Sequence, residues 1–247
     1  MNSAYHRGVA FRTELGNSTS RQLQSTYSAL IVPVGSTEQH GPHLPLDTDT
    51  RIATAVAHAV ADKLSDQDEL NWMVAPAIGY GASGEHEGFA GTVSIGTASL
   101  RHLLVEFGRS ACRWASRLVF VNGHGGNVEA LAAATALLRY EGCDVGWCSC
   151  TVENSDAHAG HTETSVLLHI SPGDVWLDER LPGNRTPLAE LMPQLRSGGV
   201  AAVSEVGVLG DPTTATAEEG ERLFAEMVEG CLRRVTRWVP DRDGILT

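Results

Sequence analysis

The chain has 247 residues, of which 42% are hydrophobic, and we expect a single domain over residues 1–247 with a sizeable buried core. Its 30 acidic residues against 18 basic ones give a formal charge of -12, which argues against nucleic acid or a membrane surface as a partner. Five cysteines without a CxxC pair support neither a disulfide framework nor a zinc ribbon, and no apolar window has the length of a signal peptide or a membrane span. We therefore expect a reduced, cytoplasmic protein.

Strand-like and helix-like patterns alternate along the chain. A short apolar run at 30–34, ended by Gly35, is typical of a strand buried on both faces. The later patterns predict a helix from about 52 to 64, strands at 72–78, 118–121 and 143–150, helices at 100–114, 127–140 and 164–169, and a C-terminal helix opened by a capping box at Thr216 and Glu219. This alternation predicts a layered α/β fold with a mainly parallel sheet, whose ligands collect at the carboxyl ends of the strands.

The stretch at 178–199 has the weakest pattern. It is rich in proline, glycine, arginine and leucine, and it carries no clear helical or strand periodicity. We expect a flexible flap or a contact between the subunits of a homo-oligomer.

The loop after the first predicted strand is dense in candidate metal ligands. Glu38 and His40 are two residues apart, so in an extended segment their side chains point to the same side, toward a common ion or ion pair. Asp49 lies near the start of the next helix, where its carboxylate can face the loop and bridge two ions. Imidazole with carboxylate suits zinc, manganese or ferrous iron, whereas calcium prefers oxygen ligands alone. The alternative is a polar loop whose aspartates cap the helix, and this is the interpretation that we prefer for Asp47.

A second candidate ligand lies in a glycine-rich turn. His124 stands between Gly123 and Gly125, where a strand ends and a helix begins, so the backbone can approach a ligand closely. A phosphate-binding turn is the alternative, but no Gly-Lys-Ser/Thr sequence is present. We therefore favour a metal-binding role for His124.

A third cluster opens the predicted helix at 164–169. Glu163 is a candidate fifth ligand or general base, and its alternative is a first-turn glutamate that interacts with the helix dipole. For His158 and His161 the sequence leaves three roles open: each residue supports a metal ligand, contacts the substrate or faces the solvent.

Other hydrolase and nucleotide motifs are missing or out of context. The sequence has no HExxH, no GxSxG elbow and no P-loop. A GxGxxG match at 79–84 is followed by further glycines and a strand-like segment at 92–95, where a Rossmann fold needs a helix.

Taken together, these segments resemble the creatininase, or creatinine amidohydrolase, family. The similarity lies in 35–45 with Asp49, in 122–127 and in 163–165, in the same order over most of the chain. It implies a three-layer creatininase-like fold and a centre of two divalent cations, Zn²⁺, Fe²⁺ or Mn²⁺. The implied ligands are Glu38 and His124 on one cation, His40 on the other, and Asp49 between them. The family pattern has a glutamate where this chain has Gly126, so we place the fifth ligand at Glu163, which argues against creatinine as the substrate.

The resemblance extends to the branch of the family that acts in the biosynthesis of the redox cofactor mycofactocin. The segment 158–163 carries this similarity, and it implies a peptidase that removes a C-terminal Val-Tyr dipeptide from the enzyme-modified precursor peptide by metal-activated water. The resemblance also places Glu85 and His86 on a loop at the substrate pocket, where His86 orients the substrate or protonates the departing amine. An exposed polar loop is the alternative.

Two other functions remain open. One is a small-molecule hydrolase of the same family that acts on a cyclic amide or a formamide, which product analysis would distinguish from a peptidase. The other is a metal-binding scaffold subunit that has lost hydrolysis. The intact set of Glu38, His40, Asp49 and His124 argues against the scaffold.

Overall fold

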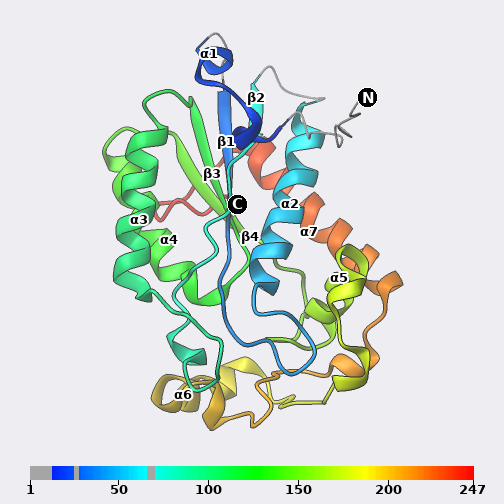
Figure 1. Ribbon diagram of the computed structural model, residues 1–247. Helices are drawn as coiled ribbons and strands as arrows, with labels where there is room; N and C mark the ends of the chain where they lie inside the picture. Colours follow the sequence, from blue (N-terminus) through cyan, green and yellow to red (C-terminus); the bar gives the residue numbers. More distant parts are fainter. Residues whose placement is uncertain (1–12, 25–27, 66–69) are drawn as a thin grey trace, which may run out of the picture.

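Four parallel strands form the central sheet in the order β2-β1-β3-β4 (Figure 1). The computed structural model describes residues 13–24, 28–65 and 70–247. The strands are β1 (Ser28–Val34), β2 (Asn71–Val74), β3 (Arg117–Asn122) and β4 (Val145–Ser149). The two inner strands, β1 and β3, are buried almost throughout, because helices cover both faces of the sheet.

Helices form a layer on each face of the sheet. The helices are α1 (Ser20–Leu23), α2 (Thr48–Ser65), α3 (Gly96–Ala111), α4 (Val128–Tyr140), α5 (His161–Ile170), α6 (Leu188–Gly198) and α7 (Ala217–Arg237), with short 3-10 turns η1 (Leu15–Asn17), η2 (Gly84–His86), η3 (Gly125–Asn127), η4 (Pro172–Asp174), η5 (Leu177–Glu179), η6 (Val200–Ala202) and η7 (Pro212–Thr214). One apolar core joins α2, α5 and α7 to the sheet, and a second joins α3 and α4 to the opposite face (Figure 1). The predicted three-layer α/β fold with a parallel sheet is confirmed.

The chain leaves β1 and β3 toward opposite faces of the sheet. The helix α2 follows β1 and packs on one face, whereas α4 follows β3 and packs on the other. Because β1 and β3 are neighbours, a crevice opens between their carboxyl ends, and ligands of open α/β sheets bind at such a point. The loops that begin at Gly35 and Gly123 meet there.

Most predicted elements are present, with two differences. The strand predicted at 72–78 ends at Val74, because Pro76 has no N–H to donate, and Ile78 pairs with Val34 only as an isolated bridge. The stretch at 178–199 contains the helix α6, which the sequence did not predict because Pro193 interrupts its pattern. Within the described residues, no helix has the length and apolarity that a membrane span requires.

The aromatic core beneath α3 and α4 provides a test of the packing. Phe120 is fully buried, and its ring centroid lies 6.1 Å from that of Phe107. Phe120→Ala is expected to lower the free energy of unfolding by about 3–5 kcal/mol, since it removes apolar contacts and leaves a cavity. Denaturant titration of the metal-free protein measures this change. Tyr140→Ala, at a side chain that is 90% exposed, is the control and should change stability by less than about 0.5 kcal/mol. Equal effects of the two substitutions would contradict the packing described here.

Candidate metal centre

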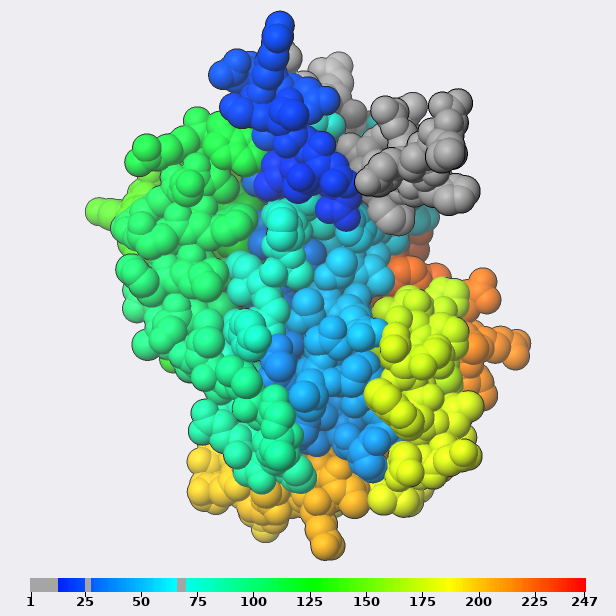
Figure 2. Space-filling view, in the orientation of Figure 1, coloured from blue at the N-terminus to red at the C-terminus, as the bar shows by residue number. Residues whose placement is uncertain are grey.

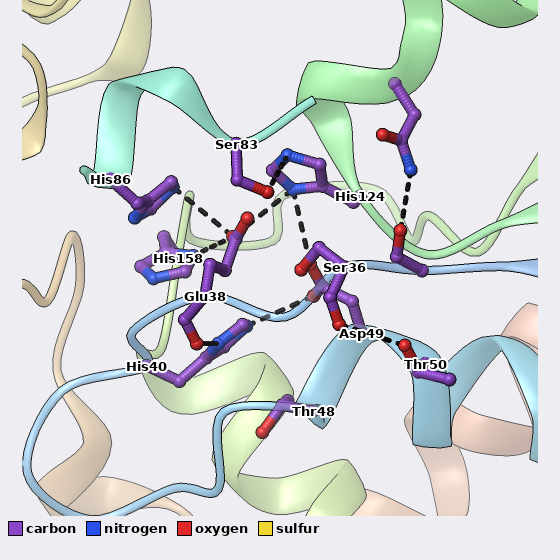
Figure 3. Close-up of polar contacts among 12 residues, drawn as sticks. Ser36, Glu38, His40, Thr48, Asp49, Thr50, Ser83, His86, His124 and His158 are labelled. Atoms are coloured by element: carbon purple, nitrogen blue, oxygen red, sulfur yellow. Dashed lines mark hydrogen bonds and ion pairs between the residues drawn. The ribbon is translucent and has the colours of Figure 1, made fainter. Parts of the chain in front are cut away.

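Acidic and imidazole side chains from three segments meet at the crevice between β1 and β3 (Figure 3). The loop after β1 contributes Glu38 and His40, the first turn of α2 contributes Asp49, and the turn after β3 contributes His124. All four residues are at least 95% buried. The four residues that the sequence singled out as ligands from distant positions therefore lie together.

Asp49 uses both carboxylate oxygens. Its Oδ2 accepts a hydrogen bond of 2.7 Å from the Ser36 hydroxyl and lies 3.2 Å from His124 Nδ1. Its Oδ1 lies 3.1 Å from His40 Nε2. Asp49 thus faces one imidazole on each side, which is the orientation that a bridging carboxylate needs.

Glu38 lies at the centre of the cluster and is unsatisfied. Neither of its buried oxygens has a hydrogen-bond partner among the described residues, although His124 Nδ1 and His86 Nε2 lie 3.2 and 3.3 Å from Oε1. Burial raises the pKa of Glu38, but His124 and His86 together outweigh it and the pKa falls to about 2. A buried, ionised carboxylate without donors requires a compensating positive charge.

Three histidines turn one ring nitrogen toward the carboxylates and the other toward a backbone carbonyl. The carbonyl contacts are His40 Nδ1 to Glu38 O at 3.1 Å, His124 Nε2 to Ala82 O at 3.2 Å, and His158 Nε2 to Gln39 O at 2.8 Å. An N–H donated to a carbonyl fixes the tautomer and leaves the other nitrogen free for a cation, as metal-binding histidines in proteins are held. His158 was left open by the sequence, and its Nδ1 lies 3.8 Å from Glu38 Oε1.

His86 has the opposite arrangement, which Gln39 sets. The Gly41 N–H donates to Gln39 Oε1 at 2.9 Å, so the amide nitrogen of Gln39 points the other way and donates to His86 Nδ1 at 2.9 Å. The proton of His86 is therefore on Nε2, which faces Glu38 Oε1. Because His86 is only 4% exposed, the exposed-loop alternative is wrong for this residue. The sequence missed Gln39, since nothing in its spacing distinguishes it from a solvent-facing residue.

Glu163 joins the cluster from the first turn of α5. Its Oε2 accepts a hydrogen bond of 2.6 Å from the Ala159 N–H and lies 3.8 Å from His40 Nε2. Burial raises the pKa of Glu163 to about 7. For His40, burial lowers the pKa, but Asp49 and Glu163 raise it to about 10. This cluster of acids therefore favours a positive charge at its centre.

The candidate ligand atoms form overlapping groups whose members lie within 4.8 Å of one another: Glu38, Asp49 and His124; His40, Asp49 and Glu163; and Glu38, His40 and His158. The first two groups share Asp49. Mixed nitrogen and oxygen donors suit zinc, manganese or ferrous iron, so these residues fit the divalent cations that the resemblance implies.

Gly126 marks the departure from the family pattern, and the carboxylate of Glu85 lies beside it. A Cβ at position 126 would lie 2.8 Å from Glu85 Oε1 and 2.5 Å from His124 Nε2. Glu85 Oε1 itself lies 3.6 Å from His124 Nε2, and the side chain of Glu85 is 35% exposed. Glycine thus leaves room for Glu85 to reach the site.

A cavity of about 440 Å³ opens onto the cluster, and a second one of about 680 Å³ adjoins it through Ala157, Leu188 and Leu209. His161 lies in the second cavity, where its Nδ1 is 2.9 Å from Thr214 Oγ1, and it is not part of the acidic cluster. The substrate-binding role predicted for His161 stays a prediction.

The carboxylates and imidazoles are buried at the carboxyl edge of a parallel sheet, and their cluster opens to a cavity. This arrangement is that of a metal-dependent hydrolase. The family model for creatininase, described as creatinine amidohydrolase, matches residues 14–235. The chain belongs to the creatininase family. It is 71% identical, over all of both chains, to a mycofactocin precursor peptide peptidase of Mycolicibacterium smegmatis.

Solved structures of creatininase share this fold. A manganese form is 27% identical to the chain with a TM-score of 0.75, over 93% of this chain and 99% of the other. The Zn-Zn form of a creatininase mutant is 26% identical with the same TM-score and coverage. Creatininases with this fold thus have manganese and zinc forms.

Proposed function

We propose that this protein is a dinuclear-metal peptidase that hydrolyses the modified precursor peptide of mycofactocin and releases its C-terminal Val-Tyr dipeptide. The relative named as a mycofactocin precursor peptide peptidase supports the substrate, because the identity of 71% extends over both full lengths. The observation that carries the chemistry is Asp49, which is shared by two groups of candidate ligands. The cytoplasmic location and the homo-oligomeric state expected from the sequence remain predictions.

The chain would hold the two cations with residues from four segments. We assign Glu38, Asp49 and His124 to one cation and His40, Asp49 and Glu163 to the other. When bound, such a pair lowers the pKa of a water molecule and polarises the scissile carbonyl. Ser36 orients Asp49, and the backbone carbonyls orient the imidazoles, so the ligands are held before the substrate arrives.

His86 acts on the substrate itself in this proposal. Its Nε2–H faces the cluster, and its Nδ1 accepts the hydrogen bond from Gln39 that prevents the ring from turning. It therefore donates a hydrogen bond to the peptide at the scissile bond and orients it. Glu85, partly exposed at the same wall, contacts the substrate beside it.

The shape of the site favours a peptide over a small cyclic amide. The two adjoining cavities share Ala157, Leu188 and Leu209, and together they form a recess that extends beyond the metal cluster. A single small ring would leave most of it to water, whereas an extended peptide would fill both parts. The recess thus supports a peptidase over a formamide or cyclic amide hydrolase.

Metal removal and product analysis test this function together. The protein treated with a chelator is expected to lose hydrolysis of the modified precursor, and Mn²⁺, Zn²⁺ or Fe²⁺ should restore it. Mass spectrometry should show the free Val-Tyr dipeptide and the shortened core. Hydrolysis of creatinine or a formamide without cleavage of the precursor would instead support a small-molecule hydrolase. Binding of the precursor without turnover would support a scaffold.

A further inference from the structure

His43 is a buried histidine that belongs to neither of the two proposed ligand groups. It lies three residues after His40 in the loop between β1 and α2, and none of its surface is exposed. Its Nε2 lies 2.8 Å from the hydroxyl oxygen of Thr164, which is also fully buried. Thr164 follows Glu163 in the first turn of α5. This hydrogen bond therefore joins the loop that carries one proposed ligand to the helix that carries another.

The same two segments also meet at the surface of the molecule. In the space-filling view the yellow-green residues of α5 and of the turns after it lie against the blue residues of the loop and of α2 (Figure 2). The Trp176 N–H donates to the carbonyl oxygen of His43 at 3.0 Å. Arg51, on α2, donates to the Asp174 carboxylate at 2.6 Å. The loop thus holds this part of the chain through its backbone as well as through the His43 ring.

The His43 ring is neutral near neutral pH. Burial lowers its pKa, and the positive charges of His40 and Arg180 act in the same direction, so that the pKa is about 4. A neutral imidazole can form a hydrogen bond with a hydroxyl as acceptor or as donor. The ring therefore makes its contact with Thr164 without placing a positive charge beside the proposed cations.

The second proposed cation site depends on the position of α5. Its ligands His40 and Asp49 come from the chain between β1 and the first turn of α2, whereas Glu163 comes from α5. Glu163 Oε2 lies 3.8 Å from His40 Nε2, and the Ala159 N–H holds it at 2.6 Å. Ligand groups must stay within about 0.5 Å of the productive geometry, so a small shift of α5 would weaken this site. The first proposed site takes no ligand from α5.

We propose that His43 is a positioning residue of the second cation site: its hydrogen bond with Thr164 holds α5 so that Glu163 stays within ligating distance of the other ligands. Residues that support metal ligands from outside are commonly worth about 10- to 100-fold in metal affinity. Because the ligands of the first site do not depend on this contact, the first cation should stay bound when the contact is lost. This inference rests on the proposed function for the assignment of the second site.

Metal titration of matched variants tests the proposal. The metal-free wild type, T164V, T164S, H43A and H43Q are titrated with Mn²⁺ in a calorimeter, and the wild type is expected to bind two equivalents. T164V keeps the shape of the side chain but lacks the hydroxyl. T164V and H43A should both bind the second equivalent about 10- to 100-fold more weakly and the first as the wild type does. T164S and H43Q can still form a hydrogen bond here and should keep most of the affinity.

Two further variants control for a general effect on the helix. His169 is an exposed histidine in the last turn of α5, so H169Q should bind both equivalents as the wild type does. The double variant H43A/T164V should weaken the second equivalent no more than H43A alone, because both substitutions remove the same hydrogen bond. The free energy of unfolding of each metal-free variant shows that it is folded.

Turnover separates this inference from the proposed function. If the precursor is not cleaved but T164V loses the second cation selectively, the proposed function fails and the role of His43 stands. If the precursor is cleaved but T164V and H43A bind both cations as the wild type does, or lose both to the same extent, the role of His43 is refuted. A wild type that binds a single equivalent, or a T164S variant that behaves like T164V, would refute it as well.

Discussion

Asp49→Ala is expected to remove both metals and to abolish hydrolysis. Asp49 is buried between His40 and His124 and belongs to both proposed ligand groups, so its loss uncouples the two sites and leaves two buried imidazoles without their shared counter-charge. The loss of kcat/KM should be on the order of a thousandfold or more, beyond the 10²–10³ seen for one stabilising hydrogen-bond donor. Metal analysis of the purified variant and turnover of the precursor measure the two effects.

Two variants control for a folding defect at this position. Asp49→Asn keeps the shape and the acceptor for Ser36 but loses the charge, so it should fold and still fail to hold two metals. Asp47→Ala changes an aspartate two residues away that pairs with Arg51 on the partly exposed side of the loop, and its metal content and turnover should match the wild type. Two metals and normal turnover in Asp49→Asn would refute the bridging role.

Glu163→Gln is expected to release one metal equivalent or to lose nearly all turnover. Glutamine is close in size to glutamate and can still accept the hydrogen bond from Ala159, but it is a much weaker ligand for the cation shared with His40 and Asp49. The loss of turnover should reach about 10²–10³-fold, similar to the loss of a main electrostatic group. Metal content measured beside single-turnover kinetics distinguishes a ligand from a general base, because only a ligand changes the metal content.

Glu129→Gln tests the alternative that Glu163 only stabilises its helix. Glu129 is an exposed first-turn glutamate of α4, so its substitution removes a helix-dipole interaction of about 0.3–1 kcal/mol and should leave metals and turnover unchanged. If Glu163→Gln behaves like Glu129→Gln, Glu163 only stabilises its helix and is not a ligand of the second cation.

The meeting of the candidate ligands was predictable because most of them follow directly after predicted strands. Parallel strands bring their carboxyl ends to one edge, so Glu38, His40 and His124 had to lie near one another once β1 and β3 were neighbours. The pairing of β1 with β3 is a tertiary property that no local spacing reveals. The burial of His86 depends likewise on contacts with Glu38 and Gln39 from another segment.

A local feature of the sequence explains why the helix α6 was not predicted. Leu188, Leu191, Met192 and Leu195 have helical spacing, but Pro193 lacks the N–H that a helix interior uses, and the surrounding stretch is rich in proline and glycine. Leu191 is the one residue of this helix that is buried. The position of α6 on the cavity wall emerges only from the fold.

Gln39 links three segments that lie far apart in the chain. Its carboxamide accepts from Gly41 N–H and donates to His86 and to the carbonyl oxygen of Gly207, at distances of 2.9 to 3.0 Å. At Gly207, where φ is +79°, a Cβ would collide with this carboxamide, so glycine is required at this position. A substitution at position 207 would displace the Gln39 carboxamide and thereby misalign His86. A histidine more than a hundred residues earlier in the chain therefore restricts which residue can occupy this turn.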